Sequence, residues 1–174
     1  MAKSLLHKKI KENIFCLAGI ITLVSLMVIF SWMFFTRDWG LKGDFYLGTN
    51  FEKYLYSGYK KTIDFSYPQE MEARLPDDYY SAFWTGTLLA PKDGAYTIFT
   101  SEDDGARLFI DNKIIIDDWK THFETESSKT IFLSKGSHLI TLEYFQLNTF
   151  ALLKLYWAID GGKKEIIPAK YLRH

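Results

Sequence analysis

The sequence predicts an all-β protein, one antiparallel β-sandwich or barrel, preceded by one transmembrane α-helix. Two observations carry this prediction. Residues 14–35 are 22 consecutive residues without a charge. After residue 37, short aromatic and β-branched runs alternate with clusters of Gly, Pro, Asp and Asn, a pattern typical of sandwiches and barrels. We therefore divide the chain into a basic cytoplasmic N-terminus (1–13), a transmembrane signal anchor (14–36) and an exported β-sandwich domain (37–174).

The uncharged run is long enough to cross a bilayer. A helix rises about 1.5 Å per residue, so the run reaches about 33 Å, against a hydrocarbon core of about 30 Å. A cleaved signal peptide has a shorter apolar region and ends at small residues, whereas this run ends in the bulky residues Trp32 to Phe35. A buried core helix is seldom apolar on every face. We therefore interpret the segment as an uncleaved anchor.

Charge sets the expected orientation. The first 36 residues hold four lysines and one acid, Glu12, so the N-terminus is expected in the cytoplasm and the C-terminal domain in the periplasm or outside the cell. Because the whole chain has 21 basic and 21 acidic residues, the remainder has a net charge of −3. It has no basic stripe, which argues against a nucleic-acid partner. The only cysteine, Cys16, lies in the run, so the exported domain has no internal disulfide.

Strands follow from the alternation of side chains. Within residues 138–145, Ile140, Leu142 and Tyr144 share one face and polar residues share the other, as in a strand with one wet side. The predicted strands are 44–47, 62–66, 81–90, 95–100, 106–110, 113–117, 129–133, 138–145 and 151–159.

Turn residues separate these strands. Asp111 and Asn112 both tolerate positive φ, so they predict a two-residue hairpin. Residues 67–80 hold two prolines and paired acids and are expected to form a longer surface loop.

Two adjacent carboxylates, Asp103 and Asp104, form the main candidate site. They lie between apolar β-type runs and precede Gly105. Because adjacent acids repel, the fold either leaves both in water, in a turn where Gly105 has positive φ, or gives them a cation. Neighbouring side chains of an extended chain point to opposite faces, so both can reach one ion only if the peptide between them turns sharply.

Catalytic motifs are absent from the sequence. It has no Gly-x-Ser-x-Gly elbow, no His-Glu-x-x-His helix and no Cys-x-x-Cys pair, and His122 and His138 are isolated. We expect no enzymatic activity. Trp84, Trp119 and Trp157 are assigned to the core.

Ordered blocks along the domain resemble a known family. They include Phe83-Trp84-Thr85-Gly86, Gly94-x-Tyr96-Thr97-Ile98, Asp103-Asp104-Gly105-Ala106-Arg107-Leu108, Ile116-Asp117-x-Trp119, Glu143-Tyr144-Phe145 and Ile167-Pro168-x-x-x-Leu172. In this order, from residue 40 to about 172, the chain resembles the protective-antigen fourteen-kilodalton domain. That family is named for an anthrax toxin component and also occurs in glycosidases, flocculins and bacterial surface proteins.

The resemblance implies an antiparallel β-sandwich. In sugar-binding members the paired Asp, joined by a cis peptide bond, holds a Ca²⁺ ion that coordinates glycan hydroxyls. An Asn and carbonyls of a later loop add ligands, and the matching loop here makes Asn148 the third metal residue. Calcium suits such a site because it accepts six to eight oxygen ligands in irregular geometry.

Two positions depart from the family pattern. Glu102 stands where the family often has Ser, which adds a negative charge. Phe150 stands where many relatives have Gly, and it could stack on a sugar ring or fill the pocket.

We therefore predict a membrane-anchored, non-catalytic carbohydrate-binding module that depends on calcium and faces the periplasm or the exterior. Asp103, Asp104 and Asn148 would bind the metal and, with Phe150, a glycan of the cell wall or surface. The alternative is an accessory or scaffold subunit of a membrane or envelope complex, docked on a membrane-protein partner.

Overall fold

The computed structural model describes residues 2–36, 38–66, 75–148 and 150–174, and the chain forms two compact units, residues 1–38 and 39–174. The first unit holds one helix, α1 (Ala2–Thr36). Among the described residues, no helix has both the length and the apolar character needed to cross a membrane.

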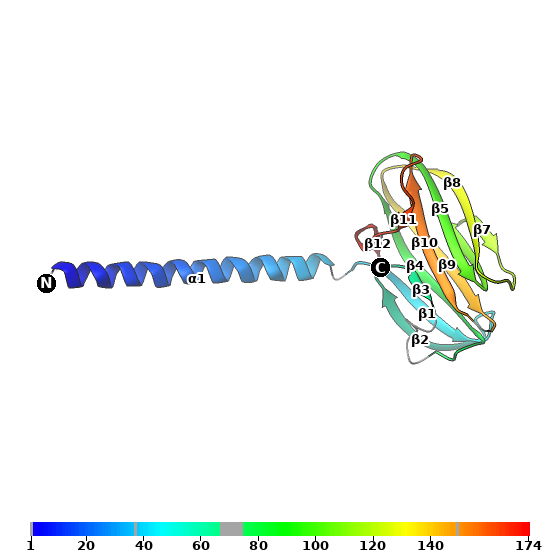
Figure 1. Cartoon of the computed structure of the whole chain (residues 1–174), viewed down its shortest axis with the longest axis horizontal. Helices are drawn as coiled ribbons and strands as arrows, with labels where there is room; N and C mark the ends of the chain where they lie inside the picture. Colours follow the sequence, from blue (N-terminus) through cyan, green and yellow to red (C-terminus); the bar gives the residue numbers. More distant parts are fainter. Residues whose placement is uncertain (1, 37, 67–74, 149) are drawn as a thin grey trace. The chain divides into compact units, whose positions relative to one another are not determined.

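The second unit is a sandwich of two antiparallel sheets (Figure 1). Within the described residues, the larger sheet has seven strands in the order β2-β1-β4-β9-β6-β7, with β12 paired to β4. The smaller sheet has five, in the order β11-β10-β5-β8, with β3 paired to β10. The predicted antiparallel all-β class is confirmed. The bounds are β1 (Leu41–Leu47), β2 (Lys53–Lys60), β3 (Asp64–Ser66), β4 (Tyr80–Ala90), β5 (Gly94–Asp103), β6 (Gly105–Ile110), β7 (Lys113–Asp118), β8 (Thr125–Leu133), β9 (Gly136–Gln146), β10 (Leu152–Ile159), β11 (Glu165–Ile166) and β12 (Leu172–Arg173).

Each of the nine predicted strands has a counterpart, with ends that shift by a few residues. The prediction missed β2 and the two-residue strands β11 and β12. Strand β2 lies at the edge of the larger sheet and buries none of its side chains fully, so its sequence has no buried alternation to signal it. Of the predicted loop 67–80, residues 67–74 lie outside the described residues and Tyr80 begins β4.

The core lies between the two sheets. Trp84 on β4 and Trp157 on β10 are each 1% exposed, which confirms their predicted core positions. The core assignment of Trp119 is wrong. Its ring is only partly buried, 4.8 Å from the ring of Phe145 and 4.2 Å from the guanidinium of Arg107. Phe145 follows the core residue Tyr144 along β9, so Trp119 packs on the opposite face of that sheet.

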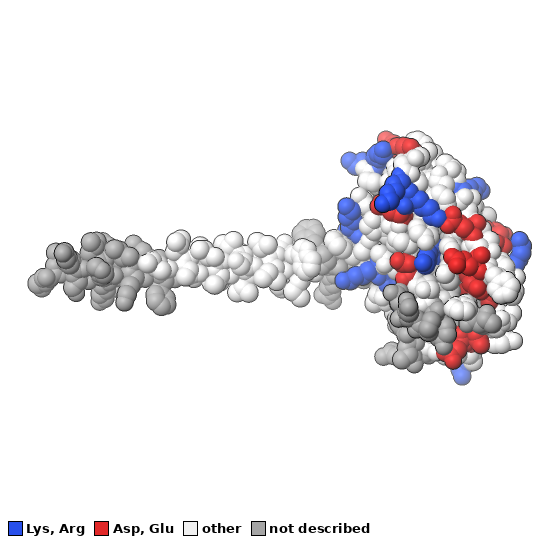
Figure 2. All heavy atoms as spheres, in the orientation of Figure 1, with Lys and Arg blue, Asp and Glu red and all other residues white. Residues whose placement is uncertain are grey.

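Charged side chains on the domain are mixed in sign. Figure 2 shows acidic and basic groups side by side on the face that it draws. Several form ion pairs, such as Arg107 with Glu143 at 2.6 Å.

The β6–β7 turn confirms the predicted hairpin: Asp111 and Asn112 have φ values of 50° and 61°. The Asp111 carboxylate accepts a hydrogen bond from the Leu139 amide (3.0 Å) and lies 2.7 Å from Nδ1 of His138. Nε2 of His138 lies 2.8 Å from the Ser134 carbonyl, which can only accept. A protonated ring donates to both partners. Burial lowers the pKa of His138, but Asp111 and the Ser134 carbonyl outweigh it, so the pKa is raised.

His138→Gln should therefore cost more stability at about pH 5.5 than at about pH 8.5. A group whose pKa is raised by folding contributes fully below its unfolded value, about 6.5, and the contribution is lost as pH rises through the folded value. Because the Asp111 side chain is 49% exposed, we expect about 1 kcal/mol or less. Urea unfolding of the unsubstituted protein and of His138→Gln across this pH range measures the difference in their free energies of unfolding. A difference that stays constant or grows with pH would contradict the assignment.

Candidate functional site

Asp103 and Asp104 lie where the chain leaves β5 in the smaller sheet and enters β6 in the larger one. They are 5% and 2% exposed, and the peptide bond between them is cis. The interpretation of a solvated turn is therefore wrong. Gly105 does not have the positive φ which that interpretation required.

Gly105 serves close approach instead. A Cβ at this position would lie 2.5 Å from a ring carbon of Phe145 and 2.8 Å from the carbonyl oxygen of Asp118. Only glycine lets the segment that follows β7 pack this closely against the start of β6. That packing brings residues 118–123 to the aspartate pair.

The two aspartates open onto one cavity of about 190 Å³. Its lining comes from three places: the β5–β6 crossing, the segment between β7 and β8, and the segment after β9. The lining residues are Asp103, Asp104, Thr121, His122, Phe123 and Asn148. Of the predicted site residues, Asp103, Asp104 and Asn148 thus come together. Phe150 is not in the lining, and its side chain is 64% exposed.

Hydrogen bonds tie the Asn148 segment to the aspartate pair. The amide of Leu147 donates to Oδ2 of Asp104 at 2.7 Å. The buried hydroxyl of Tyr144 is shared between the carbonyl of Asp103 and Oε1 of Gln146, and Nε2 of Gln146 donates to the Asn148 carbonyl at 2.9 Å. Gln146 is fully buried, so its hydrogen bond holds the backbone carbonyl of Asn148 in a fixed position relative to the sandwich.

Burial and neighbouring charges shift the pKa values of the carboxyl groups at the site. Burial, and next the charge of Asp104, raise the pKa of Asp103, while His122 and the Glu124 amide offset part of this increase. Burial also raises the pKa of the neighbouring Glu102 to about 8. The Thr100 hydroxyl beside Glu102 offsets part of that increase without reaching the geometry of a normal hydrogen bond. A bound cation would stabilise this cluster of carboxylates.

The donor set fits calcium. Two carboxylates and an amide side chain provide the hard oxygen ligands that Ca²⁺ prefers. They line one cavity, which Thr121 also lines. Asp103, Asp104 and Asn148 are therefore the residues that would hold the ion.

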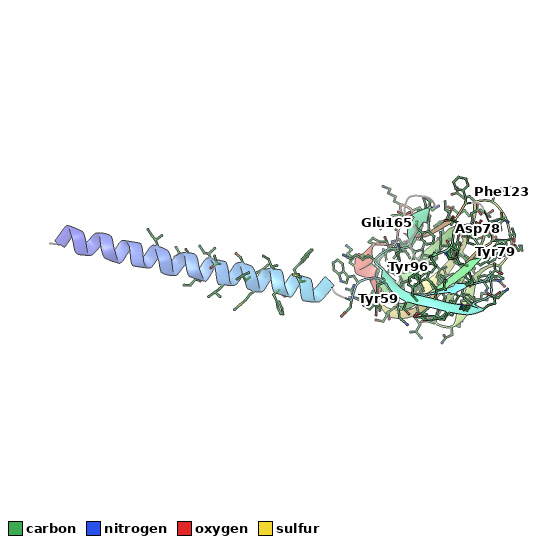
Figure 3. All side chains as sticks on the ribbon, turned by 90° about the horizontal axis from the view of Figure 1, so that it is seen from below. Tyr59, Asp78, Tyr79, Tyr96, Phe123 and Glu165 are labelled. Atoms are coloured by element: carbon green, nitrogen blue, oxygen red, sulfur yellow. The ribbon has the colours of Figure 1, made fainter. Side chains whose placement is uncertain are left out.

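Sequence reasoning missed three lining residues, Thr121, His122 and Phe123. Phe123 is 85% exposed, and Figure 3 shows its ring projecting from the domain. The one feature of the sequence that could have indicated this exposed ring is the presence of a phenylalanine at position 123. It stands in an acidic segment with no strand-like alternation, where an apolar side chain has no core to enter.

The structure is thus a β-sandwich with two carboxylates, an amide and an exposed aromatic ring around one cavity. The family model of the PA14 domain matches residues 38–171, so the chain belongs to the PA14 domain family. The resemblance drawn from the sequence blocks is confirmed.

The chain is similar to the following three proteins. Anti-sigma-I factor RsgI3 of Acetivibrio thermocellus is 35% identical over 135 residues, which are 76% of this chain and 21% of that protein. A solved anti-sigma factor domain-containing protein is 34% identical with a TM-score of 0.73, over 77% of this chain and 47% of that one. The PA14 sugar-binding domain from an RTX adhesin is 16% identical with a TM-score of 0.65, over 79% and 99%, and shows the shared fold. The chain thus spans about a fifth of the length of RsgI3.

Proposed function

We propose that the domain is a non-catalytic carbohydrate-binding module that holds its glycan through calcium at Asp103 and Asp104. The observation that carries this proposal is the burial of two adjacent carboxylates at one cavity that also contains Asn148. The name of the RTX adhesin domain, which shares the fold, supports sugar as the class of ligand. No observation on the described residues favours an accessory or scaffold subunit over this role.

Each residue has a part in the proposed binding. Calcium would supply positive charge and open coordination positions for sugar hydroxyls. Asp103 and Asp104 would hold the ion, and Gln146 and Leu147 would keep Asn148 beside it. Phe123 offers a flat apolar face at the cavity, on which a sugar ring can stack. Phe150 lies close to Asn148 in sequence and would add a second exposed aromatic contact.

We also propose that residues 14–36 anchor the domain to a membrane, with the N-terminus in the cytoplasm and the domain outside it. This proposal rests on the uncharged sequence of residues 14–35 and on the four lysines before it.

Alkaline carbonate washing of membranes tests the anchor. We expect the full chain to stay in the membrane pellet, and a chain that lacks residues 1–36 to be released. Release of the full chain into the supernatant would remove the anchor from the proposal.

Asp104→Asn keeps the shape of the side chain and removes its charge. We expect calcium affinity to fall more than about 10-fold, because the number of charged ligands sets the affinity of a calcium site. Glycan binding should fall to the level seen with a chelator. Calorimetric titration with Ca²⁺ and a glycan array with and without chelator measure the two effects. Asp117→Asn, which alters an exposed acid on β7, is the matched control. Glycan binding that is insensitive both to chelator and to Asp104→Asn would refute the calcium-dependent role.

Phe123→Ala should weaken glycan binding roughly fivefold, since an aromatic contact contributes about 1 kcal/mol. Calcium affinity should not change, because the ring provides no ligand. Phe132→Ala on β8, whose ring is 74% exposed, is the matched control and should leave both affinities intact. Equal loss in the two variants would show that Phe123 is not a specific sugar contact. Titration of the calcium-loaded chain with a bound glycan from the array gives both values.

A further inference from the structure

A second group of potential metal ligands lies at this end of the sandwich. Within the described ranges, Glu102 at the end of β5, Asp118 at the end of β7 and His122 between β7 and β8 each place one ligand atom within 4.8 Å of the others. Strands β5 and β7 belong to different sheets. The group therefore combines residues from both sheets.

Glu102 points into the sandwich. The alternate residues Tyr96, Ile98 and Thr100 of β5 are all fully buried, and Glu102 continues this inward-facing row with 0% exposure. Neither of its carboxylate oxygens has a hydrogen-bond partner. A buried carboxylate in this state is costly unless a cation or a proton neutralises it.

His122 has the tautomer that a metal ligand needs. Its Nδ1 lies 2.8 Å from the Phe123 carbonyl oxygen, which can only accept, so Nδ1 carries the hydrogen. In the neutral ring the lone pair is then on Nε2, which has no hydrogen-bond partner and lies 3.4 Å from Oδ2 of Asp118. Metal-binding histidines are commonly oriented by such a bond from the other ring nitrogen to a carbonyl.

The spacing suits a small divalent ion. Metal–ligand bonds of about 2.0–2.2 Å in a tetrahedron put ligand atoms about 3.3–3.6 Å apart, and the 3.4 Å between Asp118 and His122 falls in that range. The other Asp118 oxygen pairs with Lys120 at 3.2 Å, whose side chain is 77% exposed and free to move. The carboxylate of Glu102 lies within 4.8 Å of the ligand atoms of Asp118 and His122.

We propose that Glu102, Asp118 and His122 bind one divalent transition-metal ion, with zinc as the expected species. One imidazole nitrogen with carboxylate oxygens suits zinc, whereas calcium takes oxygen ligands. The ion would join β5 and β7 to the segment 119–124 and so fix that segment in place. This structural metal site does not depend on the proposed sugar-binding function.

Zinc titration of the full chain tests the site. A Cys16→Ser background removes the only thiol of the chain, and a chromophoric chelator competes for the metal. We expect one Zn²⁺ per chain and a loss of affinity of at least about 100-fold in His122→Ala and in Glu102→Gln. His138→Gln is the matched histidine control, because both of its ring nitrogens already have partners. Asp104→Asn should keep its zinc affinity, and a loss there would overturn a site separate from the aspartate pair.

Imidazole ¹⁵N NMR of the Cys16→Ser chain gives a reading that does not depend on the folding of the variants. On addition of Zn²⁺, the His122 ring should keep its hydrogen on Nδ1, and Nε2 should shift to the position of a metal-bound nitrogen. Unchanged His122 signals, binding through Nδ1, or zinc affinity that survives both substitutions would overturn the proposal.

Discussion

Two neighbouring carboxylates are buried at the point where the chain crosses from one sheet to the other, and the organisation of this end of the domain depends on that crossing. Strand β5 ends at Asp103, which still pairs with Leu152 of β10, and β6 begins at Gly105, so Asp104 lies between the last residue of one sheet's strand and the first residue of the other's. Tyr144 binds the carbonyl of the first and Leu147 binds the carboxylate of the second. Gly105 then allows the segment after β7 to close over them.

Burying two carboxylates at this crossing costs free energy, and the packing of the rest of the domain has to offset that cost. Burying a charge still costs several kcal/mol after relaxation. That is comparable with the burial of two or three large apolar side chains at about 1.5–3 kcal/mol each. The core of the sandwich provides this stabilisation, and it includes Trp84, Trp157 and Tyr96. Buried acids at this point are stabilised when a proton or a cation neutralises them.

The fold could be predicted wherever local sequence carries its own signal. Alternation in β9 and the positive-φ pair Asp111 and Asn112 are such signals, because they depend on neighbours along the chain. Strand β2 has no such signal, since an edge strand buries little. Trp119 was misplaced because its partners, Arg107 and Phe145, come from other strands. Aromatic residues pack on either face of a sheet.

The candidate site was predictable only in part, for the same reason. Asp103 and Asp104 are adjacent in sequence and attract attention by themselves. Their burial, which excludes a solvated turn, is a tertiary property that composition cannot supply. Glu102 and His122 stand apart in the sequence, and each alone is an ordinary acid or histidine. Their relation appears only when the two sheets bring β5 and β7 together.

The segment between β7 and β8 connects the two proposed sites. His122 belongs to the three-residue cluster and also lines the cavity, while Phe123 follows it with its ring in solvent. An exposed ring loses rotational freedom when it contacts a ligand, at a cost of about 0.5–1.5 kcal/mol. If the backbone of the segment is already held through Asp118 and His122, only the side chain has to be ordered on binding. A metal between the sheets would therefore strengthen sugar binding without touching the sugar.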